Sequence, residues 1–89
     1  MKKNFVIKEF RTYNNRDRFE KTTTKTGTYM QVYKEVLKIY DFEKSRMETE
    51  GYENVFYDNV RNVCLVLGID DKEHKNESFL IYFKEEGEL

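Results

Sequence analysis

The only histidine of the chain, His74, stands in a run of acidic residues that could bind a metal ion. Carboxylate oxygens suit hard cations, and the imidazole would add a nitrogen ligand for a borderline metal. Two lysines interrupt the run, however, and it lacks the glycine and the alternate-residue spacing of a calcium loop. We therefore interpret residues 70–77 as a solvated, charged turn, and we expect no bound metal.

The sequence contains no recognisable motif for nucleophilic catalysis. Cys64 is the single cysteine and lies in the apolar run 63–67, where we expect a small buried hydrophobe rather than a reactive thiol. Neither serine, Ser45 or Ser78, lies in a nucleophile motif, and the four glycines stand apart instead of forming a phosphate-binding loop. We expect that the chain is not an enzyme and uses no cofactor.

A basic segment with interleaved aromatic residues is the strongest binding candidate. The first 26 residues carry eight Lys or Arg against three acidic residues, and the rest carry eight against fourteen, so the net charge of −1 conceals two oppositely charged parts. Proteins that bind single-stranded nucleic acid combine a positive track with rings on which bases stack. Alternatively, the rings are core residues and the charges pair with the acidic part. The candidate residues are Arg11, Tyr13, Arg16, Arg18, Phe19 and Lys21.

The acidic part offers an opposing candidate surface. Its carboxylates could compete with nucleic acid for a basic groove on another protein, as negatively charged patches can steer binding to positive ones. The sequence leaves open which charged part meets a partner. The candidate residues of this alternative patch are Asp70, Asp71, Glu73 and Glu77.

Two strands and a turn are predicted within the basic part. Residues 4–13 are rich in aromatic and β-branched types, which favour a strand. Phe10 falls out of alternation with Phe5 and Ile7, so either both faces are partly covered or a bulge near Lys8 realigns the strand. Residues 14–15, both Asn, suit a tight turn. Residues 16–26 then return as a polar edge strand or form a mobile loop.

A helix is predicted over residues 28–48. Thr28 and Gln31 have the spacing of a capping box, and Gly51 lies where a helix would stop. Apolar residues follow with helical spacing. The predicted buried stripe is Tyr29, Val32, Tyr33, Val36, Leu37, Tyr40 and Met47, and the predicted solvent side is Lys34, Glu35, Lys38, Asp41 and Glu43.

The remaining segments favour strands. Residues 52–62 fit a strand slightly better than a helix, because Asn, Val, Phe and Tyr disfavour helical backbone. Residues 63–69 form a continuous apolar run, typical of a central strand covered on both faces, and 78–84 should return antiparallel to it. Residues 85–89 form an acidic tail that we expect to be frayed. The predicted core comprises Val36, Leu37, Tyr40, Leu65, Leu67, Leu80 and Ile81.

These elements predict one α+β domain over residues 1–89, with an antiparallel sheet packed against one amphipathic helix. Seven Phe and seven Tyr supply enough apolar area for a core, and surplus rings could form a homo-oligomer interface. No apolar run is long enough for a signal peptide or a membrane span, so we expect a cytoplasmic protein without membrane contact.

The expected function is that of a non-enzymatic protein-interaction module. The chain has no Ala, Pro or Trp and is rich in Lys, Asn, Glu, Tyr and Phe, which indicates an A+T-rich genome and suggests a phage or mobile element. Such a module would regulate or inhibit a host protein, for example a nuclease or a defence complex. The alternatives are a nucleic-acid-binding accessory protein that uses residues 11–21 and a self-assembling structural subunit.

Overall fold

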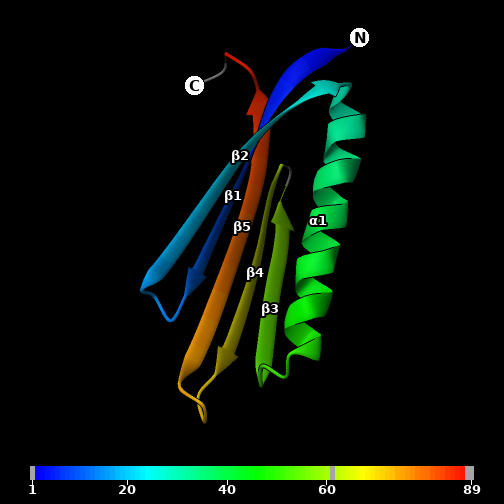
Figure 1. Cartoon of the computed structure of the whole chain (residues 1–89). Coiled ribbons are helices and arrows are strands. Elements are labelled where there is room, and N and C mark those ends of the chain that lie inside the picture. The colour runs from blue at the N-terminus through cyan, green and yellow to red at the C-terminus, as the bar shows by residue number, and fades with distance from the viewer. Residues whose placement is uncertain (1, 61, 88–89) are drawn as a thin grey trace.

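A computed structural model of the chain describes residues 2–60 and 62–87. The element order in this part is β1 (Lys3–Tyr13), β2 (Asp17–Gly27), α1 (Tyr29–Thr49), β3 (Asn54–Val60), β4 (Val63–Asp70) and β5 (Lys75–Glu85). The strands form one antiparallel sheet in the order β2-β1-β5-β4-β3, and α1 packs along one side of it (Figure 1). The predicted α+β class is confirmed.

The N-terminal hairpin forms because two consecutive asparagines accept left-handed backbone. Asn14 and Asn15 have φ angles of 51° and 57°, and the strands on either side pair without interruption from Lys3 to Tyr13. No bulge realigns β1, so Phe10 points to the face opposite Phe5 and Ile7. Residues 17–27 form an edge strand, which decides against the mobile loop.

Helix α1 begins and ends where the sequence signals predict. The backbone N–H of Gln31 donates to Thr28 Oγ1 over 3.2 Å, and the Thr28 N–H donates to Gln31 Oε1 over 2.9 Å. After the C-cap Glu50, Gly51 takes a φ of 85°, which glycine adopts without strain. Its buried residues point at the sheet and include one acid: Val32, Val36, Tyr40, Glu43 and Met47.

The middle of the sheet is occupied by β5, the last described strand of the chain. It pairs with β1 on one side and with β4 on the other, so it joins the two ends of the sequence into one sheet. Residues 54–60 are a strand, as predicted, and β3 forms the second edge of the sheet. Glu85, assigned to the tail, ends β5 instead, and residues 88–89 of the predicted tail lie outside the described residues.

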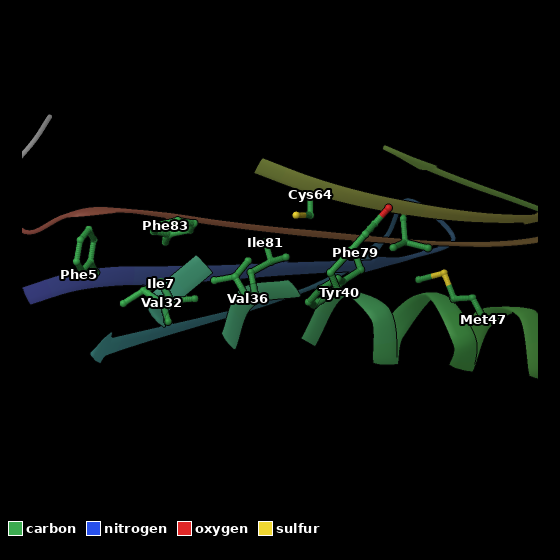
Figure 2. Close-up of a cluster of buried hydrophobic side chains, with 11 residues drawn as sticks. Phe5, Ile7, Val32, Val36, Tyr40, Met47, Cys64, Phe79, Ile81 and Phe83 are labelled. Carbon is green, nitrogen blue, oxygen red and sulfur yellow. The ribbon is translucent and has the colours of Figure 1, made fainter. Parts of the chain in front are cut away.

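The core lies between α1 and the sheet face that it covers (Figure 2). Aromatic and aliphatic side chains from β1, β4 and β5 meet the helix there, and Cys64 is buried among them as predicted. The full set is Phe5, Ile7, Val32, Val36, Tyr40, Met47, Cys64, Val66, Phe79, Ile81 and Phe83.

Of the seven predicted core residues, three are buried, three are half-buried and one is exposed, so the prediction is wrong for that one. Val36, Tyr40 and Ile81 are in the core, and Leu37, Leu67 and Leu80 are half-buried. Leu65 remains 39% exposed, because it points away from the helix. The prediction that residues 63–69 are covered on both faces is therefore wrong. Tyr29, predicted in the buried stripe, is also 48% exposed.

Candidate functional site: the open face of the sheet

The sheet has one face packed on α1 and one face that no described element covers (Figure 1). Successive side chains of a strand point to opposite faces, so the strand register sorts every residue to one side. Because Phe79 and Ile81 point at the helix, their neighbours Leu80 and Tyr82 point away from it. We call the side away from α1 the open face.

Apolar side chains dominate the open face across four adjacent strands. Leu80 pairs with Phe10 on one side and with Leu65 on the other, and Leu67 pairs with Phe56. The register therefore makes these side chains one continuous patch, which we call the open-face patch. Its members are Phe10, Phe56, Val60, Val63, Leu65, Leu67, Ile69, Leu80 and Tyr82.

Four of the nine patch residues are exposed to water, and the other five are half-buried. Phe56 is 56% exposed and Val60 58% exposed on the edge strand, and Val63 on β4 is 41% exposed. The rings of Phe10 and Tyr82 stack with their centroids 5.9 Å apart. Removing apolar surface from water contributes about 25 cal/mol per Å², and large contiguous patches on soluble proteins mark binding surfaces. This face is therefore the candidate binding surface of the chain.

Charged side chains lie at the borders of the patch and not at its centre. Lys8 on β1 pairs with Tyr82, and Asp58 on β3 pairs with Leu65, so one charge of each sign stands on the two flanking strands. Lys84 lies at one end of β5, beyond Tyr82. On the outer strand β2, Arg18 and Glu20 point to the same face.

The basic-aromatic residues predicted from the sequence are divided between the two faces. Tyr13 and Phe19 lie on the helix side and contact each other edge to face, with centroids 5.9 Å apart. Arg18 points to the open face, and Arg16 lies in the exposed turn. Lys21 is exposed on the helix side of β2. Charges of this segment also pair with acids elsewhere, as in the 2.9 Å contact of Lys25 with Glu35.

Arg11, the remaining residue of that segment, belongs to a part-buried charge network. It donates to Glu77 Oε2 over 2.8 Å and to both carboxylate oxygens of Glu43. Arg46 on α1 also contacts both carboxylates, with Nε 3.0 Å from Glu43 Oε2. The Tyr52 hydroxyl donates to Glu77 Oε1 over 3.0 Å. In the described part of the chain, no buried side-chain nitrogen or oxygen lacks a partner.

Mutual hydrogen bonds keep the arginine and glutamate side chains of the network ionised. The bond to Glu43 holds the pKa of Arg11 above its usual value. Burial acts to raise the pKa of Glu43, but hydrogen bonds from Arg11 and Arg46 outweigh it and lower that pKa. Two effects raise the pKa of Tyr52 to about 12: burial, which is the larger, and the hydrogen bond to Glu77. The prediction that Glu43 faces solvent is wrong, because two arginines neutralise it inside the helix–sheet contact.

The acidic residues predicted as an alternative patch do not form one surface. Glu77 is fully buried in the charge network, and Asp70 is buried where its Oδ1 accepts the backbone N–H groups of Lys72 and Glu73. Asp71 and Glu73 remain exposed in the turn, which also contains His74 with a φ of 51°. Within residues 2–60 and 62–87, no three metal-binding side chains gather at one point.

Tyr52 reaches the network because Gly68 leaves room for it. A Cβ at Gly68 would lie 2.9 Å from the Tyr52 ring, so the ring packs directly on the backbone of β4. Gly68 pairs with Glu77 on β5, which places the Tyr52 hydroxyl beside the carboxylate. The network thus stabilises the contact between α1, β1 and β5, and its carboxylates are fully occupied by protein donors.

The comparisons with known proteins provide no relative. No protein-family model, no curated protein and no solved structure matches the chain. Among the described residues, α1 does not combine the length and the apolar character that a membrane-crossing helix needs.

The open-face patch was missed by sequence reasoning, although the chain contains a signal for it. The run 63–67 and the run 79–83 are both apolar at every position, so each strand has hydrophobic side chains on two faces. The sequence has only one convincing helix, and one helix covers one face of a sheet. Two fully apolar strands with a single covering helix therefore imply an uncovered apolar face.

Proposed function

We propose that the chain is a non-enzymatic protein-interaction module that binds its partner through the open-face patch. The observation that carries this proposal is the exposure of apolar side chains on β4 and β3, such as Val63, Leu65 and Phe56. A protein surface can cover such a patch with its own apolar side chains. Protein interfaces have this arrangement, with an apolar centre and a polar rim.

The charge pattern of the same face supports a protein partner over a nucleic acid. Phosphate binding requires Lys or Arg along the contact surface. The centre of the open face has none, and its borders carry Asp58 and Glu20 as well as basic residues. Nucleotide bases could stack on Phe56, but the neighbouring carboxylate of Asp58 would repel the backbone.

A regulator or inhibitor of a host protein, encoded by a phage or mobile element, remains the proposed biological setting. Its support is the A+T-rich character of the composition.

Photocrosslinking in cells tests the proposed surface. A photoreactive phenylalanine analogue at position 56 or 65 should form protein adducts, because both sites lie within the open-face patch. The same analogue at Thr24, exposed on the open face of the outer strand β2, is the matched control and should give few adducts. Equal adduct yields at all three positions, or none, would contradict a binding role for the patch.

A nucleic-acid-binding role is the second candidate, supported by a hollow on the other side of the molecule. The hollow lies between β2 and the first half of α1, and its lining contains four lysines and one acid, Glu35. The lysines are Lys2, Lys25, Lys34 and Lys38. Such a concentration of positive charge could hold a phosphate backbone, although Glu35 already pairs with Lys25.

A further inference from the structure

We propose that the partner covering the open-face patch is a second copy of this chain, so that two sheets pack face to face in a two-fold symmetric dimer. The inference rests on the proposed function, because it names the partner of the same surface. Two sheets packed in this way lie about 10 Å apart, with strands aligned to within about 30°. The four-layer product would be helix, sheet, sheet, helix.

The size of the patch determines how strong such a dimer can be. Four strands about 4.8 Å apart and four residue pairs about 6.8 Å apart give a flat footprint of roughly 20 by 27 Å. That footprint, roughly 540 Å² per copy, is at the low end of protein interfaces, below the ~800 Å² that each partner buries in a standard one. The patch therefore predicts a weak dimer whose formation depends on protein concentration.

The register of the strands makes the apolar part self-complementary. Consider a two-fold axis parallel to the strands and lying between β5 and β4. It sets β5 of one copy over β4 of the other, so Leu80 lies over the second copy's Leu65 and Tyr82 over its Val63. Apolar side chains then meet apolar side chains along both middle strands.

The flanking charges are self-complementary about the same axis. The axis exchanges β1 and β3, the two strands that flank the apolar centre. Lys8 on β1 is thereby placed over β3 of the second copy, level with Val60. Asp58, the only charge of β3, lies one residue pair further along, about 6.8 Å away in the strand direction, so it is the diagonal neighbour of Lys8. Each dimer contains this diagonal pair twice. One lysine on β1 and one aspartate on β3, the two strands that the symmetry of a dimer exchanges, favour a second copy over an unrelated partner.

Charge reversal provides the decisive experiment. Lys8→Asp alone and Asp58→Lys alone should each weaken dimerisation about tenfold or more, because each creates two like-charge contacts per dimer. Mixing the two variants should restore dimers, since each copy then offers the charge that the other lacks. The double variant Lys8→Asp/Asp58→Lys should also dimerise. Sedimentation velocity across a range of concentrations measures all four samples.

Controls separate the interface from general effects of charge and folding. Lys38→Asp makes the same charge change on an exposed position of the helix and should leave dimerisation unchanged. Leu65→Asp should abolish the dimer, whereas Phe42→Asp, at a 66% exposed position on α1, should not. Circular dichroism confirms that each variant is folded.

Two outcomes would overturn the inference and remain distinct from failure of the proposed function. A wild-type chain that stays monomeric at high micromolar concentration would exclude the second copy, even if crosslinks at positions 56 and 65 captured a different protein. If both charge reversals and Leu65→Asp left the dimerisation affinity unchanged, the interface would lie elsewhere on the molecule. Absence of both dimer and crosslinks would reject the binding surface altogether.

Discussion

Arg11 shows how a single side chain acquires a structural role that its sequence neighbours do not reveal. It stands among exposed basic residues of the first hairpin, yet its guanidinium contacts two buried carboxylates and lies 5.0 Å from the centre of the Phe79 ring. Removing it would leave Glu43 and Glu77 with one cation instead of two. A buried charge that loses its partner is costly, because water cannot replace the lost interaction.

Replacing Arg11 with Met should therefore destabilise the fold by about 3–5 kcal/mol. The matched control is Arg18→Met on the same hairpin, where the side chain is exposed on the open face and the free energy of unfolding should change by less than about 0.5 kcal/mol. Urea unfolding at neutral pH measures both variants. Equal effects of the two substitutions would show that the network contributes nothing specific.

The lowered pKa of Glu43 predicts how stability depends on acidity. The folded carboxyl releases its proton more readily than the unfolded one, whose ordinary pKa is 4.5. Glu43 thus contributes stability above pH 4.5, and this contribution disappears as the pH falls through the lower folded pKa. Urea unfolding of the wild type and of Glu43→Gln from pH 7 to 3 should show the stability gap narrowing in acid. A gap that stays constant with pH would contradict this assignment.

Among the elements, β4 illustrates why two faces of one strand differ in their importance for folding. Cys64 and Val66 point into the core, whereas Leu65 between them is 39% exposed. The apolar run alone cannot distinguish these positions, since alternation is visible only when polar residues occupy the second face. The sheet partners and the position of the single helix decide which side is covered.

Truncation to alanine should reveal this difference in the free energy of unfolding. Ile81→Ala removes a fully buried side chain beneath α1 and should cost about 2–5 kcal/mol. Leu65→Ala removes a partly exposed one and should cost about 1 kcal/mol or less, measured at a dilution where the chain is monomeric. Comparable losses at both positions in the monomer would show that something within the chain covers the open face.

Local elements could be predicted from the sequence, whereas long-range contacts could not. The capping box of Thr28, the stop at Gly51 and the turn at Asn14 are encoded within a few residues, and each is confirmed. Burial of Glu43 depends on Arg11, which lies 32 positions away, and nothing local indicates that pairing. Likewise, no pattern within β1 or β5 indicates that they pair with each other.

At the scale of the whole molecule, the chain has two distinct candidate binding surfaces on opposite sides, one apolar and one basic. The open face is apolar with mixed borders, and the hollow beside the helix is rich in lysine. A thin two-layer shape, 49 by 22 by 17 Å, keeps these surfaces apart and both accessible. A partner on one surface would not exclude a partner on the other.

Nucleic-acid binding should be weak under this interpretation, since the net charge is −1. We expect no sub-micromolar affinity for single-stranded or duplex oligonucleotides near physiological salt, as measured by fluorescence anisotropy. If binding occurs, each phosphate contact should contribute about −0.7 to −0.9 to the slope of log affinity against log salt.

Two double reversals would then locate the nucleic-acid site. Loss of binding with Arg16→Glu/Arg18→Glu would implicate the hairpin, and loss with Lys34→Glu/Lys38→Glu would implicate the hollow. Sub-micromolar, salt-sensitive binding that either reversal abolishes would overturn the protein-interaction proposal in favour of the second candidate.

The middle position of β5 also determines how the chain must reach its native state during synthesis. The hairpin β1–β2 and the hairpin β3–β4 emerge from the ribosome first, but neither contacts the other in the sheet until residues 75–85 are made. Pairing of Phe5 with Glu85 closes nearly the whole chain, and contacts so distant in sequence form slowly. Until that insertion, the inner edges of β1 and β4 are unpaired, in addition to the outer edges of β2 and β3, and are exposed to chaperones and to other nascent chains.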